Sequence, residues 1–157
     1  MSHCNLRTRR YRSNEEAVRP LDRHRHNRVL VPYSPLGRGF LTGAVTSTAG
    51  LGDTDYRHRD PRFADENAAR NTSLVDRVVA VAARHNATPA QVALAWVLAQ
   101  GEDVAPIPGT KRVRYLEQNA DARKLALTAD DLELLNTIAA DTAGPRYSEA
   151  MMELVER

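Results

Sequence analysis

Two short apolar runs, each followed by a glycine-bearing loop, constrain the fold of this chain more than any other feature. The first run, residues 29–33, leads into Ser-Pro-Leu-Gly37, and the second, residues 104–107, leads into Pro-Gly-Thr-Lys111. Runs of this length are typical of strands that are covered on both faces in a parallel sheet. The two loops would bring backbone N–H groups and a positive helix end to a bound anion, most often a phosphate.

Helical patterns surround these runs. Six helices are predicted. The first three are residues 14–26, a helix from Thr72 or Ser73 to Asn86, and a helix that begins at the capping box Thr88-Pro-Ala-Gln91 and stops at Gly101. The last three are residues 113–122, a helix capped by Thr128, and a short helix from Ser148. The second of these would bury an apolar face of Leu74, Val75, Val78, Val79 and Ala82. The third is apolar around most of its circumference, so we expect it to be largely buried. Residues 37–71 have no clear periodicity and predict a long binding loop or lid, with plain disorder as the alternative.

The order of these elements indicates the fold class. Strand, helices, strand and helix is the alternation of an α/β fold with a parallel sheet. Only two strands are convincing, however, so the sheet would be incomplete. At 157 residues, the chain suits one domain with a sizeable core.

The composition indicates where in the cell the protein is expected and whether it binds a metal. Cys4 is the single cysteine, which excludes an intrachain disulfide and fits a reducing cytoplasm. No apolar run reaches the roughly 20 residues of a membrane span, and the N-terminus lacks the apolar core of a signal peptide. His24 and His26 have no carboxylate or cysteine beside them, so we predict no metal site. We expect a cytoplasmic protein without a membrane partner.

Residues 1–28 differ from the rest of the chain by their arginines. Eight arginines stand there against three acidic residues, and the first dozen residues show no hydrophobic period. We expect an atypical, partly disordered segment. Its charge would attract nucleic acid, but Tyr11 is its one aromatic residue and no binding fold is recognisable. Solvated or out-of-frame sequence is therefore the better interpretation than a nucleic-acid interface.

The first loop offers groups that suit a flat, charged ligand. Tyr33 could lay its ring against a heterocycle, Ser34 supplies a hydroxyl, Pro35 a rigid turn and Gly37 unhindered backbone, while Arg38 could meet a phosphate. Taken alone, this string also fits a structural turn, which is the simpler interpretation.

The second loop contains a local conflict. Lys111 and Arg112 place two positive charges at a helix start, where positive side chains are unfavourable unless an anion compensates them. Gly109 permits close approach of a ligand, and Thr110 supplies a hydroxyl. The conflict favours an anion site, phosphate above all, over a structural cap.

Several specific strings in one order give the chain a resemblance to a known family. They are Val31-Pro-Tyr-Ser-Pro-Leu-Gly-Arg-Gly-Phe-Leu-Thr-Gly43, Asp60-Pro-Arg-Phe63, Glu66-Asn67, Thr88-Pro-Ala-Gln-Val-Ala-Leu-Ala-Trp96, Ile107-Pro-Gly-Thr-Lys111 and Leu116-Glu-Gln-Asn119. From residue 29 to residue 147, the chain resembles the last third of an aldo-keto reductase, an NADP-dependent (β/α)₈ barrel oxidoreductase that transfers hydride to an aldehyde or ketone. The resemblance implies that residues 29–157 are the NADP-binding part of a TIM barrel, namely its last two βα units plus C-terminal helices.

The resemblance also assigns cofactor roles, with NADP as the expected cofactor. Tyr33 would stack on the nicotinamide, and the pyrophosphate with its ribose would be lined by Ser34, Pro35, Leu36 and Gly37, with Arg38 nearby. The adenosine ribose, its 2′-phosphate and the adenine would be held by Gly109, Thr110, Lys111, Gln118 and Asn119. A weaker implication is that Arg57 and Arg62 close over the cofactor, with solvated loop arginines as the alternative.

The catalytic side of the family site has no counterpart in this sequence. Aldo-keto reductases use an Asp, Tyr, Lys and His tetrad from their early strands, and the strings that carry it are absent, so we predict no catalytic residue. We expect a truncated or frame-shifted C-terminal fragment that is inactive alone and binds NADP(H) weakly at best. The alternative is an interaction module that dimerises, or complements another barrel half, through unpaired strand edges.

Overall fold

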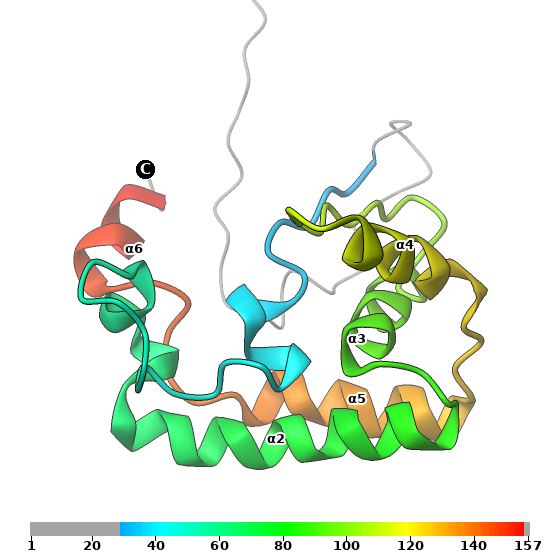
Figure 1. Cartoon of the computed structure of the whole chain (residues 1–157), viewed down its shortest axis with the longest axis horizontal. Coiled ribbons are helices and arrows are strands. Elements are labelled where there is room, and N and C mark those ends of the chain that lie inside the picture. The colour runs from blue at the N-terminus through cyan, green and yellow to red at the C-terminus, as the bar shows by residue number, and fades with distance from the viewer. Residues whose placement is uncertain (1–28, 156–157) are drawn as a thin grey trace, which may run out of the picture.

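The computed structural model describes residues 29–155, which are mostly helical (Figure 1). In chain order the helices, with η for the 3₁₀ type, are η2 (Gly37–Thr42), η3 (Tyr56–Arg59), η4 (Pro61–Phe63), α2 (Asp65–Arg84), α3 (Pro89–Leu98), α4 (Val113–Asp121), η5 (Ala122–Lys124), α5 (Ala129–Asp141) and α6 (Glu149–Val155). The predicted helix over 14–26 and every other expectation for residues 1–28 lie outside the described residues. A helix is present at each predicted position after residue 72, although several bounds differ from the prediction.

Helix α2 begins well before its predicted start. Asp65 and Glu66 stand in its first turn, where acidic side chains interact favourably with the positive end of the helix. The prediction that Thr72 or Ser73 caps this helix is wrong, because both lie inside it and their hydroxyls donate to carbonyls of the preceding turn. The prediction of a continuous loop over 37–71 is also wrong, since η2, η3, η4 and the first turns of α2 occupy much of it.

Capping boxes begin α3 and α5. At α3, the Thr88 hydroxyl accepts from the Gln91 N–H at 3.3 Å, and Gln91 Oε1 accepts from the Thr88 N–H at 2.9 Å, as predicted. No side chain of α3 is exposed, so its predicted burial is confirmed. The helix ends at Leu98 rather than continuing to Gly101, and the backbone N–H of Gln100 donates to the Val97 carbonyl, three residues back, at 3.2 Å.

The main core lies among α2, α3 and α5. Figure 1 shows α2 and α5 running side by side, and both α3 and α5 contact α2. The buried side chains of this core are Leu74, Val78, Val81, Ala82, Val92, Leu135 and Ile138. On α2 these residues follow the helical period, which places Val81 inward and leaves Val79 44% exposed. The predicted apolar face was therefore wrong at Val79 and missed Val81.

A smaller apolar cluster attaches the first glycine-bearing loop to α2. Phe40 of η2 and Phe63 of η4 meet edge to face, with ring centroids 5.1 Å apart, and both pack with Val75. Val45 closes the cluster from the side. Because Phe40 lies within the loop Gly37–Thr42, its burial fixes that loop against the helical layer.

The two predicted strands pair in parallel but remain very short. Their contacts are two isolated parallel bridges, Leu30 with Val104 and Tyr33 with Ile107. Prolines interrupt both segments, and proline has no N–H to donate, so the pairing does not extend into a ladder.

The expectation that both strands are covered on both faces is wrong. Val104 is buried, whereas Val29, Val31 and Ile107 are 63%, 50% and 56% exposed. Within residues 29–155, no further strand pairs with either segment. Among the helices of that range, none has the length and apolar character that crossing a membrane requires.

Candidate functional site

The two glycine-bearing loops lie together around one open hollow of about 270 Å³. Its lining residues are Ser34, Pro35, Leu36, Arg38 and Gly39 from the first loop and Pro108 and Gly109 from the second. The parallel bridge between Tyr33 and Ile107 stands directly before both loops and brings them together. The structure therefore unites five of the predicted site residues from two distant segments of the chain.

The first loop has an unusual backbone. Ser34, Gly37, Arg38 and Gly39 have φ angles of 50°, 58°, 59° and 95°, in the left-handed region that favours glycine. At Ser34 and Arg38, which carry a Cβ atom, this conformation costs about 1–2 kcal/mol each. Such strain persists where the surroundings enforce it, and here the Gly37 N–H donates to the Ser34 carbonyl at 2.9 Å while Phe40 is buried. The loop is therefore a tight turn that this hydrogen bond and the burial of Phe40 hold in place.

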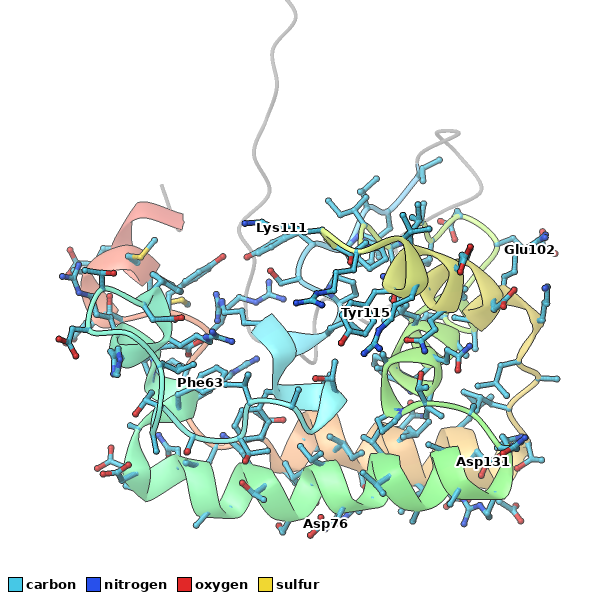
Figure 2. The ribbon with its side chains drawn as sticks, in the orientation of Figure 1. Phe63, Asp76, Glu102, Lys111, Tyr115 and Asp131 are labelled. Atoms are coloured by element: carbon cyan, nitrogen blue, oxygen red, sulfur yellow. The ribbon has the colours of Figure 1, made fainter. Side chains whose placement is uncertain are left out.

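The remaining predicted residues of the second segment lie outside the hollow. Lys111 is exposed at the start of α4 (Figure 2), and Gln118 and Asn119 are half-buried on that helix. The Thr110 hydroxyl is used locally, since it accepts from the Arg112 N–H at 3.2 Å. Lys111 forms no ion pair within residues 29–155, so its ammonium group is available to a ligand.

Arg38 lines the hollow and is paired with a buried carboxylate. Its Nη1 lies 2.6 Å from Asp60 Oδ2, and the Asp60 side chain is 0% exposed. The guanidinium also lies against two rings, 5.4 Å from the centroid of Tyr56 and 5.1 Å from that of Tyr147. Arg38 is thus fixed in position, and much of its charge is compensated.

Arg57 supports the first loop from outside the hollow. Its guanidinium binds the Asp55 carboxylate through two bonds of 2.9 and 2.8 Å, and a third N–H donates to the Arg38 carbonyl at 3.3 Å. These bonds lower the pKa of Asp55 to about 2. In this arrangement Arg57 holds the loop backbone, and it does not line the hollow.

Tyr33, at the edge of the site, is contacted by a segment that sequence analysis did not connect with it. The Arg146 guanidinium lies 4.8 Å from the centroid of the Tyr33 ring and donates to its hydroxyl at 3.2 Å. The hydroxyls of Tyr33 and Tyr147 share a hydrogen bond. Burial and this bond raise the pKa of Tyr33, although the charge of Arg146 opposes the shift. No motif marked Arg146 or Tyr147, and only the preceding Gly-Pro turn hinted that the chain changes direction there.

Asn71 and Gly144 hold this C-terminal segment in place. Asn71, buried on α2, exchanges two hydrogen bonds with Ala143, at 2.9 and 2.8 Å, and donates to the Arg62 carbonyl at 3.0 Å. Gly144 follows with its backbone against Pro61, and Arg62 Nε donates to its carbonyl at 3.4 Å. The segment 143–147 is therefore fastened to both α2 and η4.

Metal binding has no support in the part of the chain that the structure describes. Across residues 29–155, no three His, Cys, Asp or Glu side chains gather in a way that could hold an ion. His24 and His26, the pair considered from the sequence, fall outside that range.

Comparison with known proteins agrees with the strings noted in the sequence. The model of the aldo/keto reductase family matches residues 2–140, a range that includes most of the segment 1–28 set apart above. The chain is 44% identical over 124 residues to the NADP(+) aldo-keto reductase yakc of Schizosaccharomyces pombe, covering 78% of this chain and 36% of the relative. It is 45% identical over 139 residues to probable aldo-keto reductase 1 of Glycine max, covering 87% and 39%.

Among solved structures, a thermostable aldo-keto reductase in complex with the inhibitor epalrestat is 26% identical, with a TM-score of 0.48 over 70% of this chain and 29% of that one. The chain spans between a third and two fifths of the length of the relatives that it matches. The extent of the family match and the identity to these relatives show that the chain belongs to the aldo/keto reductase family.

Proposed function

We propose that this chain forms the NADP(H)-binding side of an aldo-keto reductase and does not reduce carbonyl compounds on its own. The observation that carries the proposal is the hollow into which both glycine-bearing loops contribute. Family membership makes the chain part of an oxidoreductase, and the Schizosaccharomyces pombe relative, which is named for NADP(+), supports this choice of cofactor.

The residues around the hollow fit a dinucleotide. Gly109 has no neighbouring heavy atom within 4 Å of the position that a Cβ would take, so a ligand can approach its backbone closely. Arg38 supplies a fixed positive group, and exposed Lys111 is available for a 2′-phosphate. Tyr33 would stack on the nicotinamide, which supplies a hydride to the carbonyl carbon. The other proposed contacts are Ser34, Pro35, Leu36 and Gly37 at the pyrophosphate, Gly109 and Thr110 at the ribose, and Gln118 and Asn119 at the adenine.

We also propose that residues 29–157 are the last two βα units of a partial barrel, without the catalytic tetrad. Two parallel bridges support this arrangement, because the first segment is followed by α2 and α3 and the second by α4. The coverage of at most 39% of the matched relatives is consistent with it. A chain that holds only the cofactor side would bind NADPH without oxidising it.

Two assays on the purified chain test this function. An NADPH fluorescence titration is expected to show saturable binding, and Lys111→Gln is expected to weaken it about tenfold by removing a charged contact to the 2′-phosphate. The matched control is Arg123→Gln, which removes one positive charge from exposed residue 123 on η5. In the second assay, carbonyl-dependent oxidation of NADPH should be absent. Robust turnover, or NADPH binding that Lys111→Gln leaves unchanged, would contradict the proposal.

The exposed apolar surface favours the interaction module as a second candidate function. Besides the exposed strand residues Val29, Val31 and Ile107, helix α4 has no buried residue and exposes Val113 and Leu116. Such a surface together with unpaired strand edges promotes association with another chain. Light scattering should then show a dimer or a larger species. A monodisperse monomer that Val31→Glu leaves unaltered would count against the module.

A further inference from the structure

Among the described residues 29–155, three arginine side chains and one carboxylate come together near Tyr33. Arg38 comes from the first loop, Arg62 from η4 and Arg146 from the segment before α6. All three arginines are half-buried, and within the part of the chain that the structure describes the acidic neighbour of Arg62 is Asp60. Figure 1 shows the chain segments that carry η4 and α6 at the same end of the molecule.

The carboxylate of Asp60 is already used by other partners. Its Oδ2 accepts from Arg38 Nη1 at 2.6 Å, and its Oδ1 accepts from the backbone N–H of Arg62 at 3.1 Å. The side chains of Arg62 and Arg146 form no ion pair in the described range. Their hydrogen bonds go to neutral oxygens, the Gly144 carbonyl for Arg62 and the Tyr33 hydroxyl for Arg146.

Holding these charges together is unfavourable in the absence of an anion. Burial lowers the pKa of Arg62, and the charges of Arg146 and Arg38 lower it further, while Asp60 and the Tyr33 phenol oppose the shift. Within residues 29–155, Arg62 and Arg146 keep several N–H groups without a protein partner. A planar guanidinium fork matches a carboxylate or a phosphate, which would accept these N–H groups and neutralise the charges at once.

We propose that Arg62 and Arg146 bind the carboxylate or phosphate group of a small-molecule ligand beside the ring of Tyr33. The inference rests on the proposed function for its biological meaning: the ligand is then a carbonyl compound with an acidic group, held next to the residue on which the nicotinamide would stack. The hydroxyls of Tyr33 and Tyr147 supply further hydrogen bonds there.

The anionic group could belong either to the cofactor, as one of its phosphates, or to a separate ligand. The structure favours a separate ligand. The hollow between the glycine-bearing loops is lined by Arg38 but by neither Arg62 nor Arg146. Arg62 donates instead to the Gly144 carbonyl of the C-terminal segment, and Arg146, which belongs to that segment, donates to the Tyr33 hydroxyl beside the hollow. An anion between them would lie beside the cofactor site and outside its lining.

Calorimetric titration of the complete chain with inorganic phosphate, at constant low ionic strength, tests the site. The wild-type chain is expected to bind phosphate saturably, and Arg146→Gln to weaken binding about tenfold or more, as the loss of a charged hydrogen-bonding partner implies. The charge-matched control Arg123→Gln should bind within about twofold of wild type, because Arg123 is an exposed, solvent-screened charge on η5 and does not belong to the proposed site. Equal affinity in all three proteins, or no binding to wild type, would overturn the proposal.

A second measurement does not depend on whether the variant folds. In wild-type protein, phosphate should shift the ring signals of Tyr33 and Tyr147 in NMR spectra and leave those of Tyr115 on α4 in place. Shifts confined to Tyr115, or none, would contradict the site.

Repeating the phosphate titration with NADP⁺ present separates the two sources of anion. Phosphate that still binds at saturating NADP⁺ supports a separate site, and phosphate displaced by NADP⁺ would assign the arginines to the cofactor and overturn the proposal. If phosphate binds and NADP⁺ does not, the proposed function fails while the anion site stands.

Discussion

At the scale of single residues, Gly144 shows how the segment that carries Arg146 reaches Tyr33. Its φ angle is +84°, and a Cβ added there would lie 2.9 Å from Asn67 Nδ2 and 3.0 Å from the Pro61 carbonyl oxygen. Only glycine combines this conformation with such close approach. The backbone of this residue therefore sets the distance between the C-terminal segment and η4.

Replacing Gly144 by alanine is expected to destabilise the chain more than the same change at Gly50. Gly50 has a similar φ of +80°, but a methyl group added there would have no heavy atom within 4 Å. Both variants therefore place an alanine in the left-handed conformation that favours glycine, and only Gly144→Ala adds a steric clash. We expect a loss of about 1–2 kcal/mol for Gly50→Ala and at least about 1 kcal/mol more for Gly144→Ala. Denaturant unfolding of both variants measures the difference, and equal losses would show that the close contact does not exist.

Asn71 gives a second prediction at this scale. Asn71→Ala removes both bonds to Ala143 and the bond to the Arg62 carbonyl, and it leaves half-buried backbone groups unpaired, which costs about 2 kcal/mol. The same variant should release the segment 143–147, so limited proteolysis is expected to cut near Arg146 sooner than in wild type. A variant with normal stability and an unchanged cleavage pattern would contradict the anchoring role.

The site residues that belong to local motifs could be predicted from the sequence, and those that depend on tertiary contacts could not. Ser34, Arg38 and Gly109 belong to local motifs whose residue types indicate ligand binding, and the structure brings them to one hollow. Arg146 reaches Tyr33 only because Asn71 and Gly144 position its segment, and nothing local to Arg146 encodes that contact. The cofactor roles of the motif residues remain predictions.

At the scale of elements, Asp131 joins the end of α2 to the start of α5. Figure 2 labels it beside the junction of the two helices. Its carboxylate accepts from the Thr128 N–H and hydroxyl at 3.0 and 2.8 Å, pairs with Arg84, and lies 2.6 Å from His85 Nε2. Burial raises the pKa of Asp131, but the bonds from His85, Thr128 and Arg84 outweigh burial and hold that pKa well below its usual range.

This junction predicts an acid-sensitive contribution to stability. Because the folded pKa of Asp131 lies below the unfolded value of 3.8, its stabilisation is present at neutral pH and is lost as the pH falls below about 4. Asp131→Asn should lower the free energy of unfolding by about 1–3 kcal/mol at pH 7 and flatten its dependence on pH between about 5 and 3.

The control for that prediction is Asp130→Asn, in the same turn of α5 but exposed. This variant should retain most of the free energy of unfolding at neutral pH and the steep decrease of that free energy at acidic pH, since Asp130 is outside the Thr128 capping box. Identical pH curves for the two variants would show that Asp131 does not carry the effect.

Element prediction succeeded where a local signal exists. The capping box at Thr88 and the cap at Thr128 set helix starts through their own hydrogen bonds, so sequence alone located them. The early start of α2 has no such signal, because Ala64 at its N-cap forms no side-chain cap hydrogen bond and residues 65–71 show no apolar period. For the strand segments, the apolar runs and the order of the elements predicted parallel pairing, whereas their exposure depends on what packs against them.

At the scale of the whole molecule, a helical core supports the two glycine-bearing loops that meet at the hollow. The helical layer of α2, α3 and α5 forms a core that fixes the first loop, and the short parallel pairing brings the second loop to it. Val29, Val31 and Ile107 of the strand segments are exposed. This division is consistent with a chain that spans less than two fifths of the length of its matched relatives.

Thermal unfolding of the purified chain with and without cofactor tests this central claim most directly. If the described helices and loops form the NADP side of the site, the chain should unfold in one cooperative transition, and saturating NADP⁺ should raise its Tm, because a ligand that binds only the folded state stabilises it. NAD⁺, which lacks the 2′-phosphate, should raise the Tm less. A cooperative transition that NADP⁺ leaves unchanged would contradict the claim.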